Sequence, residues 1–361
     1  MPVISASHEF EVSDLFVNLQ PIFGHRLFLK VEGFNFAGSI KLKAAREMVA
    51  RAEAAGLLGP GSTLVESSSG NMGVALSVLA AARGYGFVCV TDSRCNEATR
   101  RAMESYGTEV HVITEPHPVE GFLGARIRHV RALLAEDERR VWLNQYLSPG
   151  NWMAHYRTTA PAIARQFPDL TVLFVGAGTT GTLMGCARYF RERRPSVRVV
   201  PVDSVGSVTF GAPPAPRHIP GLGTSVRPPL LDDSLVELPV HVEERDTVRT
   251  CRELMRGGFL FGGSTGTAVG GALRWLDEHH GDGAGGVRER VTAVTIAPDL
   301  GERYLDTVYH DEWVARAIGP EGLLPGVDRT GLGAGAGAGA GADTGAGAGA
   351  GTGAGLHAVT G

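Results

Sequence analysis

The sequence of 361 residues has few of the features that mark secreted, membrane or nucleic-acid-binding proteins. Its four cysteines form no CxxC pair and no histidines have metal-ligand spacing, so we expect reduced structural thiols and no metal site. No apolar run reaches the roughly 18 residues of a membrane-spanning helix, and the N-terminus is unlike a signal peptide. A net charge of −4 provides no basic surface for nucleic acid or an anionic membrane. We therefore expect a cytoplasmic protein that acts on small molecules.

Low-complexity sequence is concentrated at the end of the chain. Residues 331–361 are nearly pure Gly-Ala repeats, which have too few core-forming side chains to offset the entropy lost on ordering. We predict that this tail is disordered. The length of the chain suits two domains with a sizeable core.

Between residues 27 and 296 the sequence alternates apolar strands with helical stretches. Strands composed almost wholly of Val, Ile, Leu and Phe indicate parallel sheets covered on both faces, and hence an α/β fold. The Pro- and Gly-rich stretch 212–229 is a long loop of the kind that is usually a functional lid or disordered. The predicted strands are Leu27–Glu32, Thr63–Val65, Gly86–Thr91, Glu109–Ile113, Thr171–Val175, Val197–Val202 and Thr292–Ile296. The predicted helices include Gly73–Arg83, Glu97–Tyr106, Ala125–Glu136, Asn151–Gln166 and Gly181–Arg193.

One lysine, Lys41, follows a small-residue turn and opens a helix. Ser39 is a suitable N-cap, which places Lys41 in the first helical turn, where the helix dipole disfavours a cation. The pKa of Lys41 should therefore be lowered, as suits an amine that attacks a carbonyl and forms a Schiff base. Taken alone, a surface lysine that opens a helix is the more ordinary interpretation, and only the three loops described next favour a reactive lysine.

Three further loops carry polar groups, two of them between a strand and a helix and the third between an apolar segment and a helix. In residues 66–73, Glu-Ser-Ser-Ser-Gly-Asn-Met-Gly offers hydroxyls, an amide and helix N-terminal N–H groups to an anion. In residues 175–185, a Gly- and Thr-rich loop without basic residues suits a phosphate held by the helix dipole. The third loop, residues 261–267, places Ser264 where its hydroxyl could meet the edge of a ligand.

The second loop also matches GxGxxG at Gly176, Gly178 and Gly181. The next strand ends in Asp203, as a dinucleotide-binding fold would require. A nicotinamide-dependent enzyme with Asp203 on the ribose is therefore a competing hypothesis. It leaves Lys41 and the serine-rich loop without a role.

Taken together and in this order, the segments resemble the fold-type II pyridoxal phosphate family of cysteine synthases and cystathionine β-synthases, over roughly residues 10 to 318. The resemblance implies two open, twisted, mostly parallel sheets, with the cofactor in a cleft between two domains. The smaller domain would comprise residues 36–143, and the larger one residues 11–35 plus 144–320. It also implies a homodimer by analogy.

Motif by motif, the resemblance implies roles for particular residues. The Schiff-base lysine would be Lys41, which would also move the α proton. The other cofactor contacts would come from Asn71, Gly178, Thr179, Thr180, Gly181, Thr182 and Ser264. The substrate contacts would come from Ser68, Ser69, Gly70, Met72 and Gln145.

Within that family, several short segments most resemble synthases of 2,3-diaminopropionate pathways in siderophore and peptide-antibiotic producers. Such an enzyme would take O-phospho-L-serine and L-glutamate and form N-(2-amino-2-carboxyethyl)-L-glutamate. Arg126 and Tyr146 would then bind the substrate phosphate, and a solvated helix arginine is the alternative interpretation of Arg126. Cysteine synthesis from O-acetylserine and sulfide, or a cystathionine β-synthase-type reaction, is the alternative.

The lysine motif departs from that of many relatives, which continue with Lys-Asp-Arg. Here the sequence is Lys41-Leu42-Lys43, so Lys43 is a second candidate for the Schiff-base lysine, although the G-S-x-K spacing selects Lys41. The altered context also leaves open a cofactor-binding regulatory subunit without turnover.

Overall fold

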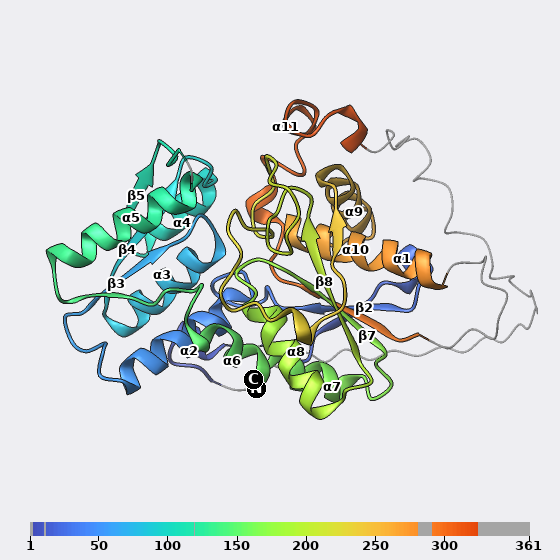
Figure 1. Cartoon of the computed structure of the whole chain (residues 1–361), viewed down its shortest axis with the longest axis horizontal. Helices are drawn as coiled ribbons and strands as arrows, with labels where there is room; N and C mark the ends of the chain where they lie inside the picture. The colour runs from blue at the N-terminus through green and yellow to red at the C-terminus, as the bar shows by residue number, and fades with distance from the viewer. Residues whose placement is uncertain (1–2, 11, 119, 281–290, 324–361) are drawn as a thin grey trace, which may run out of the picture. The chain divides into compact units, whose positions relative to one another are not determined.

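The computed structural model describes residues 3–10, 12–118, 120–280 and 291–323, and these belong to one compact unit. Two sheets organise the chain (Figure 1). The predicted tail, residues 331–361, lies outside the described residues.

The strands are β1 Phe16–Asn18, β2 Leu27–Val31, β3 Thr63–Ser67, β4 Gly86–Asp92, β5 Glu109–Ile113, β6 Arg140–Trp142, β7 Val172–Gly176, β8 Arg198–Ser204, β9 Val240–Val242 and β10 Ala293–Ala297. The α-helices are α1 Gln20–Phe23, α2 Lys41–Ala54, α3 Asn71–Arg83, α4 Glu97–Ser105, α5 Gly121–Glu136, α6 Pro149–Arg157, α7 Thr159–Gln166, α8 Gly181–Arg193, α9 Glu244–Arg256, α10 Gly263–His280 and α11 Asp311–Ala317. The short 3-10 helices are η1 Ser7–Glu9, η2 Asp233–Leu235, η3 Glu302–Tyr304 and η4 Pro320–Gly322.

The larger sheet has the order β1-β2-β10-β7-β8-β9 and the smaller one β5-β4-β3-β6. Every described strand pair is parallel except β1 with β2. The predicted α/β class with two mostly parallel sheets is therefore confirmed. The division into domains at residues 36 and 143 stays a prediction.

Helices cover both faces of each sheet because successive strand side chains point to opposite faces. In the smaller sheet, Leu64 and Cys89 pack with residues of α2 and α3, whereas the adjacent Val65 and Val90 pack against α5. In the larger sheet the same alternation buries one face under α9 and α10 and the other under α7 and α8. This double coverage explains why the strands are almost continuously apolar.

Two local predictions were wrong. The predicted helix Asn151–Gln166 is divided at Thr158 into α6 and α7, because Pro161 lacks the N–H that would continue the helical hydrogen bonding. The N-cap residue of α2 is Ile40, and no side chain caps this helix. Ser39 instead pairs through its backbone with Asp299, and within the described residues its buried hydroxyl has no hydrogen-bond partner.

Three of the four polar loops follow the carboxyl ends of parallel strands, whereas residues 261–267 come after α9 and include the start of α10. The turn before Lys41 follows β2, the serine-rich loop follows β3, and the Gly- and Thr-rich loop follows β7. Crevices at the carboxyl ends of strands are where open α/β sheets bind ligands. The topology therefore gathers these loops at the sheet edges where a site is expected.

Candidate active site

Lys41 is the first residue of α2 and is half-buried, and it borders two adjoining cavities. The turn before it is held by Asn35, whose Nδ2 donates to the carbonyl oxygens of Glu32 (3.0 Å) and Ser39 (2.9 Å). Burial lowers the pKa of Lys41 to about 8, and the nearby Asp299 carboxylate opposes this shift. The lowered pKa was expected, but its main cause is desolvation rather than the helix dipole on which the prediction was based.

The second candidate lysine, Lys43, has a structural contact instead. Its Nζ lies 2.8 Å from Oε2 of Glu32, and both side chains are buried. Lys30 shares the same carboxylate, 3.4 Å from Oε1. Lys43 does not border either cavity, so the structure favours Lys41 as the reactive lysine.

The serine-rich loop is closed by Ser68, which makes it a fixed element at the N-terminus of α3. Its Oγ accepts hydrogen bonds from the N–H groups of Gly73 (2.9 Å) and Gly70 (3.3 Å). Ser69 borders the first cavity beside Gly70. The side chain of Met72 is buried in the core of the smaller sheet, so we expect any ligand contact of Met72 to be made by its backbone.

Asn71 is oriented by two residues to which the sequence assigned no role. Its Nδ2 donates to Oδ2 of Asp299 (2.9 Å), and its Oδ1 accepts from Nη1 of Arg303 (2.8 Å). Asp299 is buried and also accepts from the Tyr304 hydroxyl. The sequence signal for these partners was the segment that follows β10. In the chain, Asp299 lies 228 residues and Arg303 lies 232 residues after Asn71.

The Gly- and Thr-rich loop between β7 and α8 forms the second cavity with Lys41 and Ser264. Thr180 has a φ of 64°, a left-handed conformation that is costly for a β-branched residue, and its buried hydroxyl has no partner within the described residues. A Cβ atom on Gly181 would lie 2.0 Å from Oδ1 of Asn151, so only glycine fits there. Asn151 also donates to Oγ1 of Thr179 (2.9 Å). Strained backbone, an unsatisfied hydroxyl and a helix N-terminus together fit a phosphate group.

Ser264, the second residue of α10, is buried and borders the same cavity. A Cβ atom on Gly221 would lie 2.1 Å from its Oγ, so the long loop approaches Ser264 closely because residue 221 is glycine. Within this loop, residues 217–225 border the first cavity.

Arg126 and Tyr146, for which the sequence predicts contacts to a substrate phosphate, both border the first cavity. Arg126 is only 6% exposed, so it is not a solvated helix arginine. Its Nε lies 3.4 Å from Oδ2 of Asp92 but makes no hydrogen bond within the described residues. Burial raises the pKa of the Tyr146 hydroxyl, and the neighbouring Arg126 and Arg217 oppose the shift.

Gln145 borders the same cavity, but its amide is engaged in the loop structure. Its Nε2 donates to the carbonyl oxygen of Ser67 (2.9 Å), and its backbone N–H donates to Oε2 of Glu66 (3.2 Å). Glu66 also accepts from the N–H of Ser67 (2.9 Å) and from Nε1 of Trp142 (3.1 Å). This buried carboxylate therefore ties the serine-rich loop to the segment that carries Gln145 and Tyr146.

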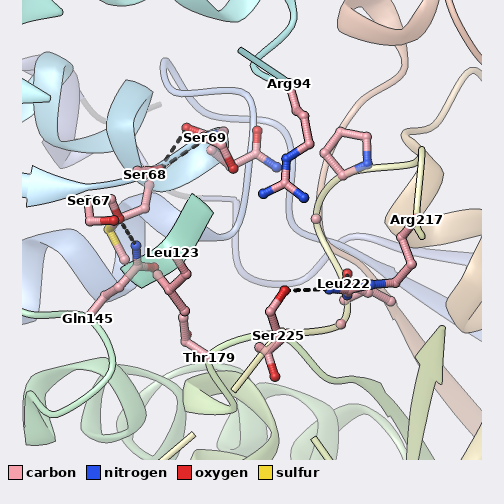
Figure 2. A pocket seen from close by; sticks show the side chains of 18 of the residues that line it. Ser67, Ser68, Ser69, Arg94, Leu123, Gln145, Thr179, Arg217, Leu222 and Ser225 are labelled. Carbon is pink, nitrogen blue, oxygen red and sulfur yellow. Dashed lines mark hydrogen bonds between the residues drawn. The ribbon is translucent and has the colours of Figure 1, made fainter. Parts of the chain in front are cut away.

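Two arginines of the first cavity were missed in the sequence, Arg94 after β4 and Arg217 in the long loop (Figure 2). Arg94 donates to Oδ1 of Asp92 from both its backbone N (3.0 Å) and its Nε (3.1 Å). Neither arginine belongs to a recognisable motif. The only sequence signals were the positions of Arg94 just after a strand and of Arg217 in a long loop.

Other predicted features were tested by the structure. Asp203 is fully buried and its Oδ1 accepts from the N–H of Ser204 (2.8 Å), so it is not presented to a ribose. Cys89, Cys186 and Cys251 are buried free thiols whose pKa values burial raises. Among the residues with described placement, no acidic, histidine and cysteine side chains cluster as metal ligands. None of the described helices is long and apolar enough to cross a membrane.

The fold and the site define a pyridoxal-phosphate-dependent enzyme of fold type II. Residues 16–295 match the family model described as pyridoxal-phosphate dependent enzyme, and the chain belongs to this family. It is an enzyme of the cysteine synthase, β-replacing class.

Three known proteins illustrate the similarity. The chain is 40% identical over 292 residues to N-(2-amino-2-carboxyethyl)-L-glutamate synthase of Ralstonia nicotianae, and the aligned region covers 80% of this chain and 84% of that protein. It is 38% identical over 306 residues to the synthase of the same name from Cupriavidus metallidurans, which covers 83% and 88%. The crystal structure of O-ureido-L-serine synthase superposes with a TM-score of 0.77 at 31% identity, covering 88% of this chain and 96% of that chain.

Proposed function

We propose that this enzyme replaces the phosphate of O-phospho-L-serine with the amine of L-glutamate and forms N-(2-amino-2-carboxyethyl)-L-glutamate, a precursor of 2,3-diaminopropionate. Two relatives at 40% and 38% identity carry the name of this synthase. The observation that supports the proposal most directly is Arg126, a buried cation in the cavity whose Nε makes no hydrogen bond within the described residues.

The residues around Lys41 suit pyridoxal phosphate. Lys41 would hold the cofactor, the loop from Gly178 to Thr182 its phosphate, and Ser264 its ring nitrogen, while Asn71 would meet its 3′ oxygen. When bound, the cofactor supplies an electron sink for the negative charge that develops at Cα of the substrate. The hydroxyl of Ser264, unlike a carboxylate, does not keep the ring nitrogen protonated. The sink is then weaker, which favours loss of a β substituent over transamination.

The first half of the reaction removes phosphate. The serine-rich loop binds the substrate α-carboxylate at the N-terminus of α3, where the helix dipole favours an anion. Nζ of Lys41 accepts the Cα proton. Because the pKa of this amine is about 8, a fraction of it is unprotonated near neutral pH and can act as the base. The Cβ–O bond then breaks, and its electron pair leaves with the phosphate. Arg126 and Tyr146 stabilise the departing anion by charge-assisted and neutral hydrogen bonds.

The second half adds glutamate. The amine nitrogen of glutamate forms a bond to Cβ and releases one proton, and Lys41 returns the proton to Cα. One phosphate leaves and one amino acid enters, so the reaction involves no net oxidation.

Mass spectrometry of the products tests the proposal directly. The purified holoenzyme, given O-phosphoserine and L-glutamate, should release one phosphate per molecule of N-(2-amino-2-carboxyethyl)-L-glutamate. Faster turnover of O-acetylserine with sulfide in a parallel reaction would identify a cysteine synthase instead.

A further inference from the structure

The first cavity carries more positive charge than the leaving phosphate alone requires. It is lined by Lys41, His218 and three arginines, Arg94, Arg126 and Arg217, and among its described lining residues there is no aspartate or glutamate. Asp92, which is not among the lining residues, contacts both Arg94 and Arg126. Because these like charges repel one another, a second anionic group bound among them would be stabilised.

Of the three arginines that line the first cavity, Arg217 is the one without a carboxylate partner at ion-pair distance among the described residues. Its guanidinium donates only to neutral acceptors, the carbonyl oxygen of Leu222 (3.2 Å) and Oγ of Ser225 (3.4 Å). Burial lowers its pKa, Asp203 opposes the shift, and Arg94 adds to it. Arg94 and Arg217 line the same cavity from different segments of the chain, and the positive charge of Arg94 contributes to the lowered pKa of Arg217.

The loop that carries Arg217 is anchored, so the guanidinium is held in place. Oε1 of Glu244, at the start of α9, accepts from the N–H groups of His218 (2.7 Å) and Ile219 (2.6 Å). On the other side, the N–H of Thr224 donates to Oγ of Ser207 (3.0 Å). Arg94 is fixed by Asp92 and stacks on Phe122, with 4.7 Å between its Cζ and the ring centroid. Figure 2 shows Arg94 extending between the serine-rich loop and the segment that carries Arg217.

We propose that Arg94 and Arg217 together bind the side-chain carboxylate of the incoming amino acid, and so select an acidic nucleophile. This inference deepens the proposed function and rests on it for the identity of that nucleophile. Arg126 is more buried than Arg94, whose side chain is 53% exposed, so the leaving group and the nucleophile would contact different arginines. A carboxylate between Arg94 and Arg217 would also relieve their mutual repulsion, which a neutral amide cannot do.

The two half-reactions separate these roles. The variants are Arg94→Gln and Arg217→Gln in the holoenzyme, with Arg128→Gln as the matched control, since Arg128 lies on α5 outside the cavity and pairs with Glu120. With O-phosphoserine alone, the rate of the phosphate burst should change less than about twofold in all three variants. With glutamate, KM should rise about tenfold or more for the two cavity variants, because each loses a charge-assisted hydrogen bond. The preference for L-glutamate over the isosteric L-glutamine should fall in parallel, and Arg217→Lys should restore part of it.

Binding of glutarate, measured by calorimetry on the holoenzyme, gives a readout independent of turnover. Arg94→Gln and Arg217→Gln should weaken it about tenfold, and Arg128→Gln should not. If the wild type makes no product from glutamate but glutarate binding still depends on both arginines, the proposed reaction is wrong and the carboxylate site remains. An unchanged preference for glutamate with unchanged glutarate binding would overturn the inference. A phosphate burst slowed as much as the glutamate step would show that these arginines serve the leaving group.

Discussion

Replacing Arg126 with methionine should separate phosphorylated from neutral substrates. The side chain is 6% exposed, and its Nε lies 3.4 Å from Oδ2 of Asp92 without forming a hydrogen bond within the described residues, so a phosphate oxygen could supply a hydrogen-bond acceptor. A charge-assisted hydrogen bond contributes about 1.5–3 kcal/mol. At about 1.4 kcal/mol for each factor of ten, kcat/KM for O-phosphoserine should fall about 10-fold to 150-fold.

The variant should still fold, because Asp92 keeps Arg94 as a partner. Oδ1 of Asp92 accepts from both Nε (3.1 Å) and the backbone N–H (3.0 Å) of Arg94. The matched control is Arg128→Met on the same helix, whose side chain is 47% exposed. The measurement compares release of phosphate from O-phosphoserine with release of acetate from O-acetylserine, both at saturating glutamate. Efficiency with O-acetylserine should change less than about threefold. Equal losses on the two substrates would refute the assignment of Arg126 to the phosphate.

Two further predictions concern Lys41 and Glu66. Borohydride treatment of the holoenzyme should fix the cofactor covalently to Lys41, and the Lys41→Ala variant should lose this label. The Lys43→Ala variant should retain the label but melt at a lower temperature, because Glu32 loses a buried partner. Label on Lys43 in the wild type would reverse the assignment. Burial raises the pKa of Glu66 from 4.5 to about 7. Between pH 4.5 and 7 the folded state therefore binds more protons than the unfolded state, so the free energy of unfolding should fall as the pH rises through this range. Glu66→Gln should flatten that dependence in urea unfolding measured at successive pH values, and an unchanged slope would show that Glu66 is not its cause.

Several features of the site could be read from local sequence because they depend on neighbours in the chain. Continuous apolar strands indicated sheets covered on both faces, and both sheets are mostly parallel. The three edge strands β1, β6 and β9 were missed, since segments of three residues are too short to show a period. The spacing of the Gly-Ser-x-Lys motif selected Lys41, and the Gly- and Thr-rich loop indicated a phosphate site at a helix N-terminus.

The sequence by itself determined the class of fold, the family and the order of the loops, because strand periodicity, glycine placement and helix N-termini act over a few residues. Only the tertiary structure decided which of several similar side chains line the cavities. Lys43 forms a buried ion pair with Glu32, whereas Lys41 borders the cavities, and burial distinguishes Arg126 from the exposed Arg128. Arg94 and Arg217 line one cavity from segments more than a hundred residues apart, and Asp299 with Arg303 orients Asn71 over a still longer separation. Burial, ion pairing and desolvation depend on neighbours in space, and these are properties that no local pattern of residues contains.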